Sequence, residues 1–327
     1  MTAVLPRVRL LAFGGTIASV PRSGTGAVEP ALAAAEIVAA VPALAGVADL
    51  ELQDFPPVAS YEVTPAHMLM LAREVEKARA DGVDGVVVTH GTDTIEETAY
   101  ALALMLERTG PVALTGAMRN PSLTAPDGPA NLLAAVRVAA GEAARELGPV
   151  VVLNDEVHAA RLVTKSHTSK VSTFVSEGGP AGGVTEDRVA IWWRPAWADA
   201  VGLPDDVDGT RVELVRVVAG MSDTLIRAAT ASKPAGIVIE GTGGGHVPQA
   251  LLPALQEAID GGIPVVVGSR TGAGETFAHT YRMPGAELDL AERGAILAGR
   301  LAGPKARLRL LFGVAAGRDP RALFPVG

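Results

Sequence analysis

Glycine- and threonine-rich segments carry the residues best suited to chemistry. Residues 14–18 read Gly-Gly-Thr-Ile-Ala and residues 90–94 read His-Gly-Thr-Asp-Thr, with Ser60 and Tyr61 between them in the chain. Glycine lets the backbone approach a ligand closely and point free N–H groups at it. A helix starting just after Asp93 would add a positive dipole that favours a carboxylate. These segments therefore indicate a site for a small ligand that carries a carboxylate.

A threonine nucleophile needs a base, because its hydroxyl is weak at neutral pH. Lys165 is the candidate, provided that burial favours its neutral amine. Asp93 would hold that amine or a substrate ammonium. The alternative is that Lys165 is a solvated surface lysine, the commoner fate. His90 is interpreted as an orienting or core residue rather than the base.

Simpler explanations exist for the same segments. The Gly-Gly-Thr sequence at 14–16 is also compatible with an ordinary tight turn, and Thr94 with a helix cap. Glu97 follows Thr94 at the spacing of a capping box. The predicted helix has an apolar stripe and is ended by residues 110–111; the stripe consists of Ile95, Ala99, Leu102 and Leu106.

Short β-branched runs alternate with Ala- and Leu-rich amphipathic segments, which predicts βα units around a mainly parallel sheet. A helix is predicted to follow Thr64 as N-cap, with Pro65 at its first position, and to stop near Gly82. Ligands of such sheets bind beyond the carboxyl ends of strands, where residues 14–18 and 90–94 fall. Seven strands are expected, at 8–13, 83–89, 112–115, 150–153, 212–218, 236–240 and 264–268.

A polar, Gly- and Pro-containing stretch after Trp197 breaks this alternation. With 327 residues, the chain has room for two domains of ~150 residues each. We predict an N-terminal catalytic domain at 1–195, a linker at 196–210 and a C-terminal α/β domain at 211–327.

Composition narrows the function further. The net charge of −8 and the lack of a Lys/Arg run argue against a nucleic-acid partner. No apolar run approaches the ~20 residues of a membrane span, and no signal segment is recognised, so a cytoplasmic protein is expected. Without cysteine there is no thiol nucleophile, and the histidine spacing predicts no metal. The glycine-rich loops lack the pattern of a phosphate-binding loop, so no cofactor is expected.

Six motifs, taken together, resemble the bacterial-type L-asparaginases, in order and spacing along nearly the whole chain. They are Gly-Gly-Thr-Ile-Ala at 14–18, His-Gly-Thr-Asp-Thr at 90–94 with Glu-Glu-Thr-Ala at 96–99, Gly-Ala-Met-Arg at 116–119, Asp-Gly-Pro at 127–129, Asn-Asp at 154–155 and Val-Thr-Lys at 163–165.

This resemblance implies hydrolysis of the side-chain amide of L-asparagine to L-aspartate and ammonia. Thr16 matches the threonine that attacks the amide, forming an acyl-enzyme. Thr92, Asp93 and Lys165 match a second catalytic group. Further positions are implied to bind substrate: Ser60, which with Asp93 grips the α-carboxylate and α-ammonium, Tyr61, Gly91, and the backbone of Ala117 at the side-chain amide.

The resemblance also implies an architecture: a larger flavodoxin-like domain and a smaller domain with a parallel sheet. It implies a homodimer or homotetramer, with sites between N- and C-terminal domains of different subunits. The alternatives are a glutaminase-asparaginase of broader specificity, an amidotransferase subunit, and a non-catalytic amino-acid-binding protein on the same scaffold. Self-cleaving threonine asparaginases do not fit an unbroken chain.

Two departures from the family pattern bear on specificity. Residues 23–30, where the family carries a lid tyrosine, contain none. We hypothesise that Tyr281 replaces it from a neighbouring subunit; the alternative is a packing tyrosine. The loop at 241–246 lacks an asparagine common in the family, which leaves the preference between asparagine and glutamine open.

Overall fold

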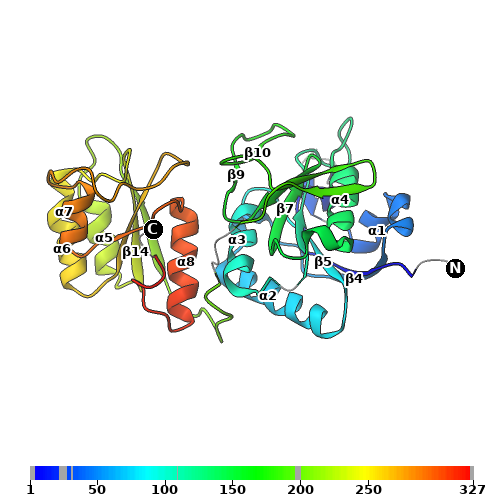
Figure 1. Ribbon diagram of the computed structural model, residues 1–327, viewed down its shortest axis with the longest axis horizontal. Helices are drawn as coiled ribbons and strands as arrows, with labels where there is room; N and C mark the ends of the chain where they lie inside the picture. The colour runs from blue at the N-terminus through cyan, green and yellow to red at the C-terminus, as the bar shows by residue number, and fades with distance from the viewer. Residues whose placement is uncertain (1–3, 22–27, 31, 109, 196–199, 325–327) are drawn as a thin grey trace. The chain divides into compact units, whose positions relative to one another are not determined.

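The computed structural model describes residues 4–21, 28–30, 32–108, 110–195 and 200–324 (Figure 1). The chain divides into two compact units, Met1–Ala200 and Val201–Gly327. Trp197, where the domain boundary is predicted, lies outside the described residues.

The first unit is built on an eight-stranded sheet in the order β12-β11-β8-β7-β6-β5-β1-β4. Its five parallel strands, counted along the chain, lie in the order 2-1-3-4-5, which is the flavodoxin-like arrangement that was predicted. The parallel strands are β1 (Arg7–Ala12), β4 (Asp49–Asp54), β5 (Gly85–Thr89), β6 (Val112–Thr115) and β7 (Pro149–Leu153), and the antiparallel ones are β8 (Glu156–Ala159), β11 (Gly182–Thr185) and β12 (Arg188–Ile191).

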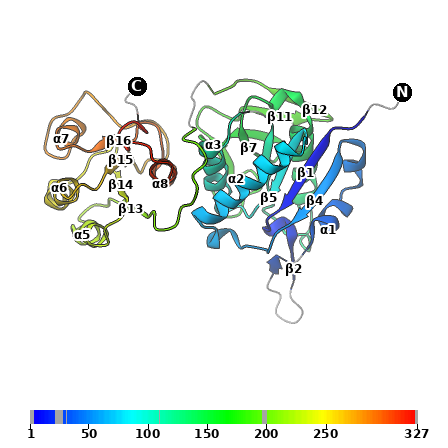
Figure 2. The ribbon, with the colours of Figure 1, turned by 90° about the horizontal axis from the view of Figure 1, so that it is seen from below.

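Helices cover both faces of this sheet (Figure 2). The central strands β5, β6 and β7 are buried along their whole length, as expected for parallel strands enclosed by helices. One face packs against α1 (Ala34–Ala39) and α4 (Gly128–Ala140), through a core that includes Leu10, Val87 and Leu132. The other is covered by α2 (Pro65–Ala80) and α3 (Ile95–Met105).

Two small hairpins and four short 3₁₀ helices complete the described part of the first unit. The hairpins are β2 (Ser19–Pro21) with β3 (Val28–Pro30), and β9 (Val163–Lys165) with β10 (Phe174–Ser176). The 3₁₀ helices are η1 (Thr16–Ala18), η2 (Pro42–Gly46) and η3 (Ser60–Glu62), and a fourth, η4 (Glu142–Ala144), precedes β7.

The second unit is a four-stranded parallel sheet in chain order. Its strands are β13 (Val212–Arg216), β14 (Gly236–Gly241), β15 (Val265–Ser269) and β16 (Ile296–Leu297). Helices α5 (Thr224–Ala231), α6 (Leu252–Asp260) and α7 (Glu287–Glu292) lie on one side of it and α8 (Gly303–Ala315) on the other (Figure 2); η5 (Gln249–Leu251) precedes α6. The predicted strand–helix alternation is confirmed.

All seven predicted strands are present, and their ends differ from the prediction by two residues at most. Thr64 caps α2, accepting a hydrogen bond from the His67 amide, and Pro65 is its first residue, as predicted. The prediction of a capping box at Thr94 is wrong. Thr94 precedes α3, but its side chain makes no capping hydrogen bond and is used elsewhere. This helix also ends earlier than predicted, at Met105.

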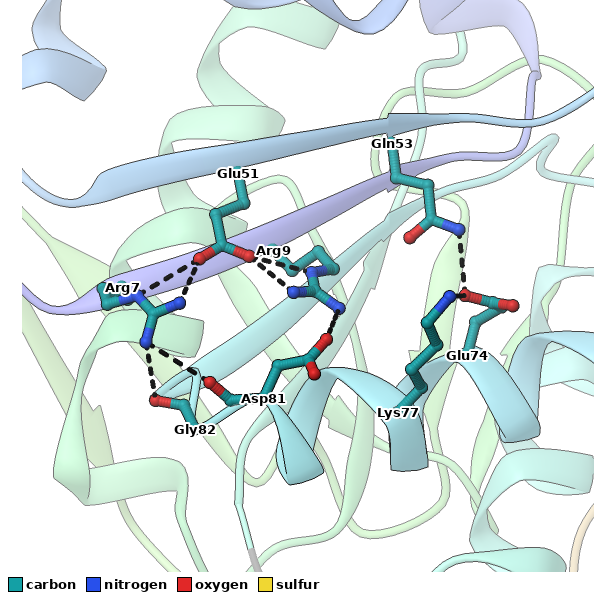
Figure 3. Close-up of polar contacts among 8 residues, drawn as sticks. All are labelled: Arg7, Arg9, Glu51, Gln53, Glu74, Lys77, Asp81 and Gly82. Atoms are coloured by element: carbon teal, nitrogen blue, oxygen red, sulfur yellow. Dashed lines mark hydrogen bonds and ion pairs between the residues drawn. The ribbon is translucent and has the colours of Figure 1, made fainter.

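A network of ion pairs joins β1, β4 and the end of α2 at the amino end of β1, away from its carboxyl end (Figure 3). Both Arg7 and Arg9 bind the carboxylate of Glu51, with Arg9 Nη2 2.6 Å from Glu51 Oε2. Arg9 Nη1 also lies 2.8 Å from Asp81 Oδ2, and the Arg9 side chain is only 12% exposed. The network fixes β4 and α2 to the strand that leads into residues 14–18.

Candidate active site

The two threonine segments meet at the carboxyl ends of neighbouring strands β1 and β5. Gly15 has a φ of +95°, and a Cβ placed there would lie 2.5 Å from the carbonyl oxygen of His90 and 2.6 Å from the nitrogen of Gly91. Only glycine permits this backbone contact. The structure therefore brings the residues around Thr16 against the segment that contains Thr92.

Thr16 itself is half-buried in η1, and its neighbour Ile17 is buried. The Ser19 hydroxyl donates to the Gly15 carbonyl at 3.0 Å, which closes this turn. A Cβ on Gly128 would meet the Ile17 side chain at 2.9 Å, so the start of α4 packs directly against η1.

A third segment, η3, is held against residues 90–94 by hydroxyl groups. The Thr94 hydroxyl donates to the Ser60 carbonyl at 2.6 Å, and the Ser60 hydroxyl donates to Asp93 Oδ2 at 3.1 Å. This contact explains why Thr94 does not cap α3. Gly91 is required here as well, because a Cβ on it would lie 2.6 Å from the Cβ of Ser60.

Lys165 reaches this cluster from the β9–β10 hairpin. Its Nζ lies 2.8 Å from Thr92 Oγ1 and 2.7 Å from Asp93 Oδ1, and its side chain is 14% exposed. The alternative of a solvated surface lysine is wrong. A lysine amine hydrogen-bonded to a buried threonine hydroxyl is the arrangement that a threonine-based acyl transfer needs.

The charge of Asp93 is stabilised within the cluster. The hydrogen bond from Lys165 lowers the pKa of Asp93 below its ordinary 3.8, against the opposing effect of burial, and the Ser60 hydroxyl contributes in the same direction. The Asp93 side chain is 57% exposed, so its carboxylate is also open to an incoming ammonium group.

His90 is a buried structural residue, which confirms its interpretation as an orienting or core histidine. Burial lowers its pKa to about 4. Its Nδ1 lies 2.7 Å from the Gly91 carbonyl oxygen and its Nε2 2.9 Å from the Thr98 hydroxyl. Since a carbonyl can only accept, Nδ1 carries the proton and Nε2 accepts from Thr98. The imidazole therefore fixes the peptide that precedes Thr92.

A polar network around the buried Asn131 side chain holds the segment around Ala117. Asp127 accepts hydrogen bonds from the amides of Met118 and Arg119, the shorter at 2.8 Å. Asn131 donates to the Gly116 carbonyl at 3.0 Å and accepts from the Asn154 amide at 2.9 Å. The motifs at 116–119, 127–129 and 154–155 are thus parts of one structure. The sequence did not indicate Asn131, which lies one helical turn beyond Asp127.

The two tyrosines proposed to bind substrate differ in their surroundings. Tyr61 lies in η3 beside Ser60, and its side chain is 75% exposed. Tyr281 belongs to the second unit, where its ring lies 5.5 Å from that of His246 and 6.0 Å from that of Phe277. These rings line a cavity of about 860 Å³ within that unit. Of the predicted lid at 23–30, residues 23–27 lie outside the described residues.

Comparison with known proteins places this site in a family. The model of the N-terminal asparaginase domain matches residues 7–197, and that of the glutaminase/asparaginase C-terminal domain matches residues 211–324. A probable L-asparaginase of Deinococcus radiodurans is 40% identical over all of this chain and 99% of its own length. A glutaminase-asparaginase of Pseudomonas fluorescens is 32% identical over 98% of this chain and 89% of its own.

A solved structure agrees in fold. The crystal structure of a probable cytoplasmic L-asparaginase from Campylobacter jejuni superposes with a TM-score of 0.86 at 30% identity, covering 97% of this chain and 98% of that one. The chain is an amidohydrolase by class. More narrowly, it belongs to the asparaginase family. Among the described residues no helix is long and apolar enough to cross a membrane.

Proposed function

We propose that this enzyme hydrolyses the side-chain amide of L-asparagine to L-aspartate and ammonia. The observation that carries the proposal is the Lys165 amine, hydrogen-bonded to both Thr92 and Asp93, beside the backbone contact that joins the Thr92 and Thr16 segments. A hydroxyl nucleophile, a lysine and an exposed carboxylate are the groups that amide hydrolysis of an amino acid requires.

The amino-acid end of the substrate binds at Asp93 and Ser60. The exposed, ionised Asp93 carboxylate pairs with the α-ammonium. The Ser60 hydroxyl, which donates to Asp93 Oδ2, turns to donate its one hydrogen to the α-carboxylate. That carboxylate lies near the start of α3, where the helix dipole favours an anion. Tyr61 and Gly91 border this end, and the backbone of Ala117 contacts the side-chain amide.

Catalysis proceeds in two steps. The Thr16 oxygen bonds to the amide carbon while its proton passes to Lys165 through the Thr92 hydroxyl, and the same proton leaves with the amide nitrogen as ammonia. Water then attacks the acyl-enzyme, and its proton returns to Thr16 as aspartate departs. Lys165 acts as base in each half, which requires its neutral amine at the moment of attack.

A second candidate function is broader hydrolysis of asparagine and glutamine. The resemblance to the Pseudomonas glutaminase-asparaginase and the absence of an asparagine from residues 241–246 favour it. A third candidate is a non-catalytic amino-acid-binding protein, but binding alone does not require the Lys165–Thr92 contact.

Several finer features complete the proposal. The catalytic domain comprises residues 1–195, joined by a linker at 196–210 to the C-terminal domain at 211–327. The enzyme is cytoplasmic and assembles as a homodimer or homotetramer, and each site is completed by a neighbouring subunit. Tyr281 then serves in place of the missing lid tyrosine.

Ammonia release tests the main proposal. The purified chain is assayed with L-asparagine and with L-glutamine over a range of concentrations. We expect a higher kcat/KM for asparagine. Comparable kcat/KM values for the two amides would favour an enzyme that hydrolyses both. Release of ammonia from neither amide would overturn the proposed hydrolysis.

Tyr281→Phe tests the tyrosine proposal, because it removes the hydroxyl and keeps the ring that packs on His246 and Phe277. We expect kcat to fall by about 10-fold or more, as for loss of a group that assists proton transfer. An unchanged kcat would identify Tyr281 as a packing residue.

A further inference from the structure

Glu96 connects the hairpin that carries Lys165 to helix α3. Its Oε2 accepts a hydrogen bond from the main-chain N–H of Lys165 at 2.9 Å, although the two residues are 69 positions apart. Glu96 is half-buried in the first turn of α3, three residues after Asp93.

The hairpin depends on such contacts, because β9 and β10 form a sheet of two short strands apart from the eight-stranded sheet (Figure 1). The buried side chains of Val163, at its base, and of Phe174, which pairs with Lys165, anchor it to the core. Lys165 is the last residue of β9, and beyond it residues 166–170 are exposed. The Glu96 hydrogen bond therefore acts where the hairpin leaves the core.

One short segment of chain consequently holds Lys165 at two points. Thr92 and Asp93 bind its amine, and Glu96 binds its main chain. A lysine side chain has four flexible carbons and loses rotamer entropy when it is fixed in one geometry. Fixing its main chain against the same segment that carries its partners keeps the amine within reach of the Thr92 hydroxyl.

We propose that Glu96 is a positioning residue, which acts through the Lys165 backbone to keep the amine on Thr92. The proposal rests on the role proposed above for Lys165. It assigns a function to a residue of the 96–99 motif that the site itself does not use.

Another role for Glu96 would be simple helix stabilisation, since acidic residues in a first turn favour the helix dipole. The two roles differ in what glutamine does. Glutamine loses the charge but keeps an acceptor oxygen for the Lys165 N–H, whereas alanine loses both. If Glu96 only stabilises the helix dipole, the alanine and glutamine variants should have equal kcat. If Glu96 positions Lys165, the glutamine variant should have a kcat close to that of wild type.

The test compares Glu96→Ala with Glu96→Gln in the full-length chain, using kcat and KM for asparagine and the pH profile of kcat. We expect Glu96→Ala to lower kcat by about 10-fold, to change KM little and to shift the pH profile. Glu96→Gln should restore most of kcat and the profile. Glu107→Ala, a matched loss of charge at an exposed residue beyond the other end of α3, should match wild type.

Amide hydrogen exchange at Lys165 gives a readout independent of activity. Glu96→Ala should speed exchange of this amide, and Glu96→Gln should leave it protected. Equal kcat values for the alanine and glutamine variants, or unchanged exchange in Glu96→Ala, would overturn the positioning role. A wild-type chain that releases no ammonia would instead overturn the proposed function, so the two failures are distinguishable.

Discussion

At the scale of single residues, a few hydroxyl and carbonyl contacts decide what the threonine segments become. Thr94 has the sequence of a helix cap, yet its hydroxyl binds the Ser60 carbonyl and joins two segments instead. Residue types and spacing predicted Thr16, Thr92 and Asp93 as candidates. They did not predict that Lys165, 73 residues beyond Thr92, would lie 2.8 Å from it, because that contact depends on the path of the intervening strands.

The buried histidine His90 makes stability depend on pH. Its folded pKa is about 4, against an ordinary 6.5, because burial disfavours the imidazolium. Between pH 4 and 6.5 the imidazole of His90 is protonated in the unfolded chain but not in the folded protein. The contribution of His90 to the unfolding free energy is therefore complete above pH 6.5 and is lost as pH falls toward 4. At ~1.4 kcal/mol per pKa unit the loss is roughly 3 kcal/mol.

Urea unfolding of wild type and His90→Gln between pH 4.5 and about 8 measures this effect. His158, whose pKa burial also lowers to about 4, should contribute a similar dependence. The variant should therefore keep about half of the wild-type slope in this range. Equal slopes for the two proteins would show that His90 is not held neutral by the fold.

At the scale of secondary structure, the buried strands were predictable, whereas the edge strand β4 and the short antiparallel strands were not. The runs at β5 and β7 are apolar throughout, so they stand out in the sequence. Strand β4 reads Asp-Leu-Glu-Leu-Gln-Asp and lies at the sheet edge, where its Glu51 side chain binds both arginines of β1. Short antiparallel strands such as β11, with two glycines in four residues, carry too little pattern to predict.

The start of α4 should control the segment around Ala117. Asn131→Leu removes the donor to the Gly116 carbonyl and the acceptor for the Asn154 amide, leaving both groups without these partners. We expect a loss of about 2 kcal/mol in unfolding free energy and a fall in kcat of about 10-fold.

Chemical unfolding and steady-state kinetics check this pair of effects. Asn120→Ala is the control, because the Asn120 side-chain oxygen accepts from Ser122 within its own turn. A stable Asn131→Leu protein with wild-type kcat would mean that the network does not position the site.

At the scale of the whole molecule, the sequence predicted two α/β units, because strand and helix patterns alternate in both halves. The parallel order within each unit follows from that alternation. The ion-pair network at the amino end of β1 was not predictable, since Arg7, Arg9, Glu51 and Asp81 look like ordinary surface charges in the sequence.

That network should stabilise the first unit without affecting catalysis, because it lies at the amino end of the strand whose carboxyl end leads to Thr16 (Figure 3). Glu51→Ala removes the carboxylate that binds both arginines. We expect a loss of about 1 kcal/mol in unfolding free energy that shrinks at high salt, with kcat unchanged. Unfolding curves at low and high salt measure it; a change in kcat would contradict this separation.

The most direct measurement of the catalytic claim compares Lys165→Met with Lys170→Met in ammonia release from asparagine. Both changes remove one lysine amine from the same hairpin, but only Lys165 contacts Thr92 and Asp93, and residue 170 is exposed. We predict that Lys165→Met lowers kcat by roughly 10³-fold or more while Lys170→Met retains wild-type activity. A folded Lys165→Met protein as active as Lys170→Met would contradict the proposed chemistry.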